Sequence, residues 1–236
     1  MGFMRARSDE QREERRRQIL AAAAAMLVEM PVAKVTLNEL SRRTCLAKSN
    51  VLRYFESREA VLLELLDTEM RDWLTQLETT SEPVAGTARE RGDQLADVLV
   101  TSLTSRPTLC DLISVQAAVL EHNVSTEVAL HYKRASRRTV ERQARWVLRY
   151  LPELGDQDAT RLVAMTTLIT AAAWPWSRPS AAMLAAYAAD PAVAAMRGEF
   201  TDLLRQSLHV TLSGLLARRD DLPVGTARID TVHRDA

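Results

Sequence analysis

Apolar residues recur at spacings of three and four along most of this chain, and this pattern constrains the fold more than any other feature of the sequence. Residues at these spacings share one face of an α-helix, so each run predicts a helix with one buried stripe. The clearest stripe begins at Leu62 and continues through Leu66, Met70, Trp73 and Leu77. Because only seven glycines interrupt the 236 residues, we expect an all-α protein.

Capping and helix-breaking residues divide the chain into separate helices. Pro31 ends the first helix. Thr36 and Glu39 have the spacing of a capping box, which predicts the start of a short second helix. We expect a third helix over residues 47–55 and a fourth after Ser57. The other helices are expected near residues 11–30, 89–105, 108–121, 124–151, 157–174, 180–189 and 199–218.

The second and third helices are short and close together, which is typical of a helix-turn-helix. Leu40 and Val51 are placed to pack these helices against each other, and Phe55 anchors the end of the third helix. Three polar residues of its first turn then face outward, namely Lys48, Ser49 and Asn50. The sequence therefore predicts an N-terminal three-helix helix-turn-helix domain joined to a larger C-terminal helical bundle.

The charge of the chain is divided unevenly, although the total is zero. Residues 1–55 contain eleven Lys or Arg against six Asp or Glu, so this segment is basic and the remainder is acidic. A basic segment on an acidic protein suggests a polyanionic partner for that segment. A basic segment more often reflects a solvated surface than a binding site, so the charge supports the helix-turn-helix prediction but would not carry it alone.

The residues expected to face outward have side chains suited to DNA. Asparagine can form two hydrogen bonds with adenine, lysine can donate to guanine or to phosphate, and serine can contact either kind of base edge. Four further residues are suited to phosphate oxygens, namely Thr36, Arg53, Tyr54 and Arg58. Singly, each is an ordinary surface residue, but the whole set favours DNA binding over an unrelated helical hairpin.

The run VTLNELSRRTCLAKSNVLRYFESREAVLLELL, residues 35–66, resembles the DNA-binding domain of TetR-family transcriptional regulators. The shared features are a Thr-capped second helix, a short third helix ending in Tyr-Phe, and then Ser with a basic residue opening the fourth helix. The preceding run RRRQILAAAAAMLVE resembles the first helix of that family. The motif-level resemblance covers about residues 11–66, and the rest is similar only in length and helicity.

Carried over position by position, the resemblance implies contacts to base edges and to phosphates. The implied base contacts come from Asn38, Lys48, Ser49 and Asn50, and the implied phosphate contacts from Thr36, Tyr54 and Arg58. Three positions depart from the family pattern. Cys45 replaces a common turn glycine, Leu52 replaces a frequent aromatic residue, and Ala47 is a weak helix cap.

The resemblance also implies a division of the chain. We expect a DNA-binding domain over residues 1–56 with a basic arm at 1–17, an effector and dimerisation bundle over 57–218, and a flexible tail at 219–236. A helix-turn-helix reads two half-sites through a two-fold dimer, so a homodimer is expected. Candidate interface residues are Phe200, Leu204, Ser207, Leu208, Thr211 and Leu215, although such a stripe could equally belong to the core of one subunit.

The bundle is the place where the resemblance implies a ligand cavity. The candidate lining combines apolar residues with a few polar ones, as ligand pockets do. It comprises Cys110, Ile113, Gln116, Trp146, Met165, Thr166, Ile169 and Trp174, all of which are also compatible with plain core positions. The effector expected there is small and largely apolar.

Other classes of protein find little support in the sequence. The local motifs of phosphate-binding loops, zinc proteases and serine hydrolases are missing, so an enzyme is not expected, and neither a cofactor nor a metal site is indicated. Glu127 and His131 have a metal-compatible spacing but lack supporting ligands. The apolar run at 162–176 is too short to span a bilayer, and Cys45 and Cys110 form no disulfide framework, so we expect a cytoplasmic protein.

Together these features predict a dimeric, ligand-responsive transcriptional repressor that binds a palindromic double-stranded DNA operator and is released by a small-molecule effector. Two alternatives stay open. One is a constitutive DNA-binding helical protein without an effector, and the other is an all-helical metabolite-binding enzyme with an incidental basic N-terminus.

Overall fold

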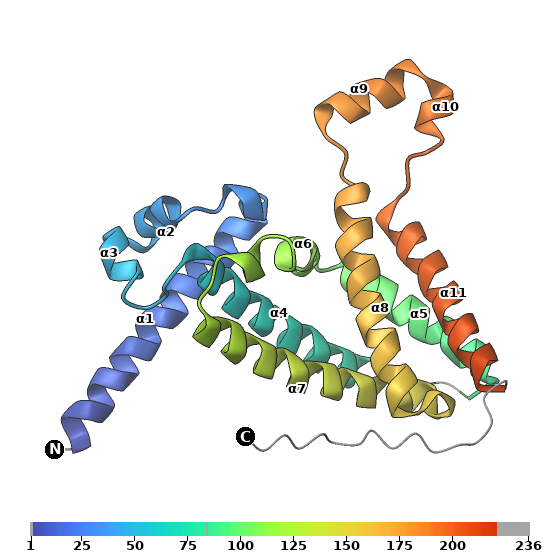
Figure 1. The fold of residues 1–236 in the computed structure, drawn as a ribbon, viewed down its shortest axis with the longest axis horizontal. Helices are drawn as coiled ribbons and strands as arrows, with labels where there is room; N and C mark the ends of the chain where they lie inside the picture. The colour runs from blue at the N-terminus through green and yellow to red at the C-terminus, as the bar shows by residue number, and fades with distance from the viewer. Residues whose placement is uncertain (1, 84, 221–236) are drawn as a thin grey trace, which may run out of the picture.

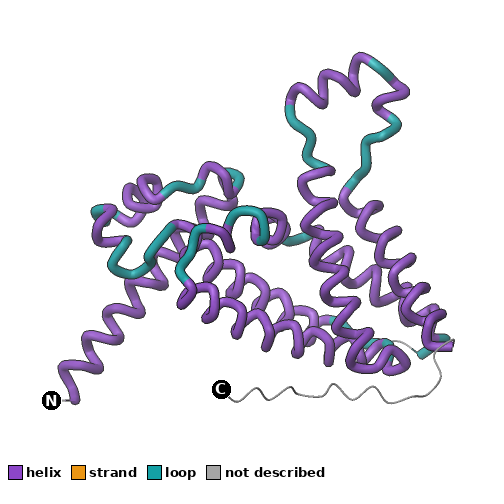
Figure 2. Tube along the Cα trace, viewed as in Figure 1, coloured by secondary structure: helices purple, strands orange, loops and turns teal. Residues whose placement is uncertain are grey.

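The structure is a computed structural model that describes residues 2–83 and 85–220, with side chains described for residues 10–83 and 85–218. It confirms the all-α prediction, because the described residues form helices and connecting loops with no strand among them (Figure 2). Every helix within these ranges is too short or too polar to traverse a lipid bilayer.

The N-terminal helices in chain order are α1 (Gly2–Glu29), α2 (Leu37–Thr44), α3 (Lys48–Val51) and α4 (Arg58–Thr80). They are followed by α5 (Ala88–Thr104), α6 (Pro107–Gln116), α7 (Thr126–Tyr150), α8 (Gly155–Trp176), α9 (Ala181–Ala189), α10 (Pro191–Ala194) and α11 (Phe200–Asp220). Short 3-10 turns lie between some of them, namely η1 (Val32–Lys34), η2 (Leu120–His122) and η3 (Pro152–Leu154).

Several helix boundaries differ from those expected. The first helix begins at Gly2, so the backbone of the expected basic arm is helical from residue 2 onward, whereas the side chains of residues 1–9 lie outside the described part. The helix expected to reach residue 121 ends at Gln116 and is followed by a separate 3-10 turn. Most of the expected tail, residues 221–236, lies outside the described residues.

The third helix is shorter than expected because its last turn tightens. The amides of Arg53 and Tyr54 donate to carbonyls three residues earlier, Asn50 O and Val51 O, at 3.2 and 3.0 Å. This is the bond pattern of a 3-10 turn rather than of an α-helix. The tightened turn still brings Phe55 to its expected buried position.

The helix caps agree with the sequence in part. The Thr36 hydroxyl accepts a bond from the amide of Glu39 at 3.1 Å, and Ser57 caps α4 in the same way. The return half of the capping box is missing, because the Glu39 carboxylate pairs with arginines of its own helix instead. A complete capping box occurs between Thr87 and Glu90, where α5 begins.

Helices α1, α2 and α3 form a small N-terminal unit that packs on α4 (Figure 1). Leu40 and Val51 are completely buried between α2 and α3, which confirms the packing predicted for this pair. Ile19 and Met26 supply the contacts from α1. The buried side of the helix-turn-helix is thereby fixed, and its opposite side faces solvent.

The larger bundle is built around α8. It packs against α6 and α7 on one side and against α11 on another, while α11 also packs on α5 (Figure 1). The rings of Trp146 and Tyr150, both residues of α7, pack in a tilted arrangement with their centroids 5.1 Å apart. Trp174 meets Phe200 edge to face at 5.0 Å, which joins the end of α8 to the start of α11.

A helical hairpin formed by α9 and α10 stands away from the rest of the molecule (Figure 1). Neither of its helices has a buried residue, although α9 consists of apolar and small side chains apart from Tyr187. Met183, Leu184 and Met196 are all exposed. The hairpin is therefore an apolar projection inserted between α8 and α11.

Candidate DNA-contacting surface and bundle cavity

The first turn of α3 presents a polar face to solvent. Lys48, Ser49 and Asn50 are exposed, whereas Val51 on the other side of the same turn is completely buried. The side chain of Ala47 provides no cap, so the helix is held by the packing of Val51 and Phe55. Three of the four residues predicted to read base edges therefore lie together and are unobstructed within the described structure.

The turn before α3 has an unusual backbone conformation at Cys45, the residue that replaces a common turn glycine. Cys45 has φ 51° and ψ 33°, which is the left-handed region that disfavours most side chains. Its amide donates to Arg42 O, and its side chain is exposed. Because the thiol points away from the core, the turn accommodates a side chain without disturbing the packing of α2 on α3.

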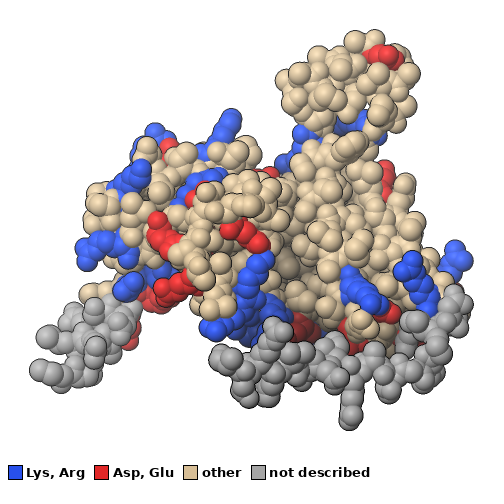
Figure 3. Space-filling model, viewed as in Figure 1, with Lys and Arg blue, Asp and Glu red and all other residues tan. Residues whose placement is uncertain are grey.

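The other predicted DNA contacts surround this turn. Thr36, Asn38 and Arg53 are exposed, and Tyr54 is half-buried. Neither Lys48 nor Arg53 forms an ion pair within the described ranges, so both charges are available to a partner. Basic side chains gather over this end of the molecule (Figure 3).

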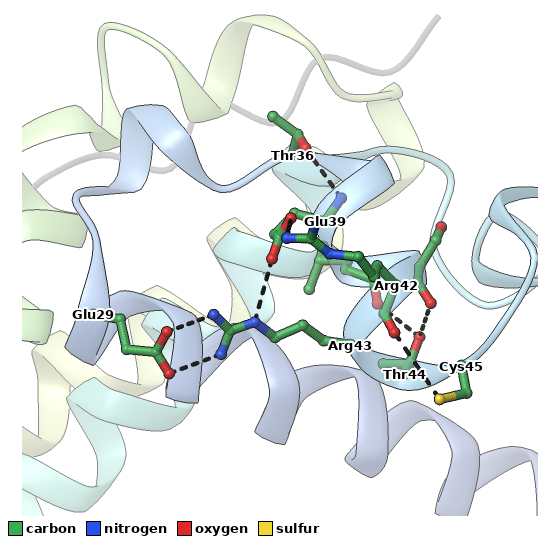
Figure 4. A network of polar contacts seen from close by, with 9 residues as sticks. Glu29, Thr36, Glu39, Arg42, Arg43, Thr44 and Cys45 are labelled. Carbon is green, nitrogen blue, oxygen red and sulfur yellow. Dashed lines mark hydrogen bonds and ion pairs between the residues drawn. The ribbon is translucent and has the colours of Figure 1, made fainter.

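Two arginines of α2 are held in a network with acidic residues. Arg43 pairs with Glu29 of α1 and also contacts Glu39, which in turn pairs with Arg42 (Figure 4). These hydrogen bonds hold the pKa of Glu29 and that of Glu39 below the usual value. The network neutralises much of the charge on α2 and ties it to α1, which leaves α3 as the more available basic element.

Arg58 is engaged inside the protein. Its guanidinium donates to the carbonyl oxygens of Val32 and Val35 and pairs with Glu59 at 3.0 Å. These contacts bind the start of α4 to the segment that precedes α2. We therefore expect Arg58 to position the helix-turn-helix, in place of the phosphate contact that the sequence suggested.

Replacing Arg58 by methionine should lower the free energy of unfolding by about 2 to 3 kcal/mol, because two carbonyl oxygens lose a charged donor. Thermal and chemical denaturation followed by circular dichroism measure this loss. The affinity of this variant for DNA should depend on salt concentration as in the wild type: the slope of log affinity against log salt concentration should be unchanged, because no phosphate contact is removed.

Arg53→Met is the matched control for this experiment, because Arg53 is exposed and unpaired within the described structure. It should leave stability unchanged and reduce the salt slope by about 0.9 for each half-site, or about 1.8 for the proposed dimer, if its guanidinium binds one phosphate. A stable Arg58→Met protein whose salt slope falls by about that amount would restore the phosphate assignment of Arg58.

Arg16 joins the turn that follows α3 to α1 and α4, a role that the sequence did not indicate directly. Its guanidinium donates to Tyr54 O at 2.5 Å, pairs with Glu64 and lies 4.3 Å from the ring centroid of Phe55. Burial raises the pKa of Glu64. The sequence does contain a signal for this role. Arg16 lies three residues before Ile19, so it shares the apolar face that the first helix turns toward the protein.

Two further bonds connect the N-terminal unit to the bundle. The amide of Val32 donates to Asp111 of α6 at 2.9 Å, and the amide of Ser125 donates to Glu56 at 2.6 Å. The first bond attaches α6 directly to the segment that Arg58 also holds. A displacement of α6 would therefore move the segment that precedes α2.

A cavity of about 320 Å³ lies inside the bundle between α4, α6, α7 and α8. Met70, Ile113 and Val163 contribute apolar wall, and Gln143 is a buried polar group of the lining. Leu168 lines the cavity and is also exposed, so the cavity opens toward solvent beside α8. Its volume is at the low end of the range of small-molecule sites.

The structure brings only two of the eight predicted effector residues to this cavity, Ile113 and Gln116. Cys110 is buried elsewhere and donates its thiol hydrogen to Leu103 O at 3.3 Å, while burial raises its pKa to about 12. Met165 is turned to solvent on α8. The remaining four pack outside the cavity lining, namely Trp146, Thr166, Ile169 and Trp174.

The predicted dimer residues of α11 divide between two environments. Phe200, Leu204 and Leu208 are buried within their own chain. Ser207, Thr211 and Leu215 are partly exposed. The outermost face of α11 instead carries Val210, Ser213, Gly214 and Ala217. The contact of α11 with α5 and α8 accounts for this shift, because it occupies the leucine stripe.

The described residues contain no group of three or more His, Cys, Asp or Glu side chains that could hold a metal ion. Glu127 and His131, whose spacing was compatible with a metal, are both exposed on α7.

Comparison with protein families gives two matches that together cover most of the chain. Residues 19–65 match the family described as "Bacterial regulatory proteins, tetR family". Residues 67–219 match the family described as "Tetracyclin repressor-like, C-terminal domain". A comparison with curated proteins finds no match.

Solved structures share the same fold at low sequence identity. A TetR transcriptional regulator from Rhodococcus sp. RHA1 has a TM-score of 0.54 and 15% identity, over 86% of this chain and 97% of that chain. The fatty acid degradation regulator FadR from Bacillus halodurans has a TM-score of 0.51 and 14% identity, over 84% of this chain and 94% of that chain. At such identities the likeness concerns the fold alone.

Proposed function

Because this chain belongs to the TetR family, whose members are DNA-binding transcription factors and not enzymes, we propose that it is a ligand-released repressor that binds a palindromic operator as a homodimer. The cytoplasm is its expected site of action. We keep the division into a DNA-binding domain over residues 1–56 and a bundle over 57–218 as part of this proposal.

The exposed face of α3 is the observation that carries the DNA-binding part. Lys48, Ser49 and Asn50 are exposed on a helix whose opposite side is buried, which is the arrangement a recognition helix needs to enter the major groove. Asn38 is exposed at the start of α2 and belongs to the same proposed base-reading set. Thr36, Arg53 and Tyr54 are the proposed phosphate contacts.

The exposed sides of α8 and α11 support the dimer. On α8, Met165, Leu168 and Trp176 are exposed at successive spacings of three and eight residues, so they share one face. On α11, Val210 is exposed, and a Cβ added at Gly214 would have nothing within 4 Å. Two apolar faces on adjoining helices suit burial against the same faces of a second copy.

Release by an effector is supported by the position of α6. This helix supplies Ile113 and Gln116 to the cavity and Asp111 to the bond with Val32. A ligand that displaces α6 would therefore move the segment before α2 and change the spacing of the two recognition helices in the dimer. This is the route by which we propose that ligand binding weakens operator binding.

Transcription from a promoter that contains the operator tests the proposed role. Purified protein should lower transcript yield in vitro, and the yield should recover when a ligand occupies the cavity. An increase in transcript on adding the protein would show an activator. Repression that no cavity-bound ligand relieves would favour the constitutive DNA-binding alternative.

A further inference from the structure

Helix α7 is strongly basic, although it belongs to the part of the chain in which acids outnumber bases. It contains seven Lys or Arg against two Glu, and basic side chains gather over it (Figure 3). Five of the seven are arginines that follow one another at spacings of four, four, three and four residues, so they share one face of the helix. We call them the arginine stripe, and they are Arg134, Arg138, Arg142, Arg145 and Arg149.

Most of the arginine stripe is exposed and unpaired. Four of its five members are exposed and form no ion pair with any described residue, namely Arg134, Arg138, Arg145 and Arg149. Arg142 is half-buried and pairs with Glu78 of α4. Glu141 lies beside the stripe, but its carboxylate pairs with Arg137 at 3.6 Å. Four positive charges are therefore available to a partner.

The arginine stripe begins beside the N-terminal unit. Arg134 lines a surface depression that also contains Arg53, from the turn after α3. A second depression lies between α4 and α7 and is lined by Arg71 and Arg138. Ala135 lines both depressions, so the two adjoin. The basic surface therefore continues from a proposed phosphate contact of the N-terminal unit along the bundle.

The acidic residues of the first depression leave the stripe largely unopposed. Three of its four carboxylates already bind a donor within the protein, namely Glu56, Glu64 and Asp67. The fourth belongs to Glu127, which lies two helical turns before Arg134. The stripe is thus bounded by an acid at its N-terminal end and remains basic from Arg134 onward.

We propose that the arginine stripe binds the phosphates of double-stranded DNA outside the half-site that α3 contacts. The planar guanidinium group of arginine matches phosphate with two parallel N–H donors. From Arg134 to Arg149 the stripe spans about 22 Å, at about 1.5 Å per residue. A duplex carries about one phosphate charge per 1.7 Å of its axis, so it offers more anions over this length than the stripe has arginines. The inference rests on the DNA contact proposed for α3 and goes beyond it, because it adds a contact from the bundle.

The side chains that accompany the stripe favour duplex DNA over other negatively charged partners. The large aromatic rings of α7 are buried and cannot stack on the bases of a single strand, namely Tyr132, Trp146 and Tyr150. The apolar face of α7 packs on α4 and α8, so it is not free to enter a membrane surface. An acidic protein would need apolar anchors, whereas the stripe consists of arginines alone. Contacts with phosphates carry no sequence information, so the stripe adds affinity without changing base preference.

Two triple variants of the full chain test the inference. The stripe variant replaces exposed arginines of the stripe and comprises Arg138→Gln, Arg145→Gln and Arg149→Gln. The control variant removes the same charge from other exposed positions and comprises Lys133→Gln, Arg137→Gln and Arg89→Gln. Both should melt at the temperature of the wild type, as measured by circular dichroism, because all six side chains lie at the surface.

Two measurements distinguish the two possible sources of the DNA. If the stripe contacts DNA that flanks the operator, the salt slope of the stripe variant on a flanked operator should fall by about 2.7 for each subunit in contact, at about 0.9 per arginine. On a duplex that ends at the half-sites, its slope should equal that of the wild type. If the stripe holds a separate duplex, wild-type protein saturated with operator should retain a labelled duplex of unrelated sequence, and the stripe variant should lose it.

The comparison of the two variants decides the inference. It is supported if the stripe variant differs from the wild type in either measurement while the control variant does not. A stripe variant that matches the wild type in both measurements would overturn it, and so would a control variant that changes by the same amount. Repression and effector release are tested by transcription, so failure of the proposed repressor role would leave this result unaffected.

Discussion

Replacing Lys48 and Asn50 together by alanine should lower the affinity for the operator by about 2 to 6 kcal/mol per half-site, or roughly 30-fold to 10⁴-fold for each half-site, because each base contact discriminates by about 1 to 3 kcal/mol. The fold should be unaffected, since both side chains are exposed and α3 is held by Val51 and Phe55. Fluorescence anisotropy with operator and scrambled DNA measures the two affinities, and the difference between them should shrink.

The control for this pair is Arg137→Ala, an exposed basic residue of α7 in the bundle. It removes a positive charge far along the chain from the proposed recognition helix, so it should leave operator preference intact. A double variant that keeps the full preference for operator over scrambled DNA would remove Lys48 and Asn50 from the base-reading set.

Replacing Val210 by arginine should convert the proposed dimer to a monomer. Val210 is 74% exposed on α11, and in the proposed dimer the new charge would be buried without a partner on both sides of the interface. Burying each unpaired charge costs about 3 to 5 kcal/mol, so the two arginines together weaken the dimer by about 6 to 10 kcal/mol, or roughly 10⁴-fold to 10⁷-fold. Sedimentation equilibrium measures the change, and operator affinity should fall with it.

Leu130→Arg is the matched control, because Leu130 is also a large apolar residue exposed on a helix but belongs to α7. This variant should remain dimeric at the same concentrations. If Val210→Arg and the wild type sediment identically, the face formed by α8 and α11 is not the interface.

Local signals were sufficient to predict the helix-turn-helix. The Thr36 cap and the burial of Leu40 and Val51 follow from residue types at fixed short spacings, and the structure confirms each of them. The cap and this packing depend on contacts within one or two helical turns, which sequence patterns report well. The left-handed conformation of Cys45 does not follow from its residue type, and only the glycine common at this position in the family pointed to it.

Features that depend on contacts between distant helices could not be predicted in the same way. The choice of which apolar stripe of α8 lines the cavity, and which faces outward, is made by α4, α6 and α7 together. Met165 and Gln143 show the consequence: the predicted Met165 is exposed, whereas Gln143, which was not predicted, lines the cavity. Helical spacing shows which residues share one face of a helix, but it does not show which other helix packs against that face.

Arg58 shows a second limit on what the sequence can predict, which concerns the role of a single basic residue. Its position at the start of α4 suggested a phosphate contact, and the structure shows that three of its five N–H donors bind Val32 O, Val35 O and the Glu59 carboxylate. A basic residue near a recognition helix has the same sequence signature whether it binds phosphate or positions the backbone. Only the three-dimensional arrangement separates the two roles.

Selection of bound DNA from a random library by the full-length protein tests the central claim most directly. The claim is that a dimer reads two half-sites through Lys48, Ser49 and Asn50 on the exposed face of α3. The expected result is an enriched two-fold symmetric sequence whose half-site centres are about 34 Å apart or a multiple of that distance, and the Lys48→Ala, Asn50→Ala double variant should fail to enrich it. Enrichment of no sequence at any salt concentration, or of the same sequence by the double variant, would contradict the account.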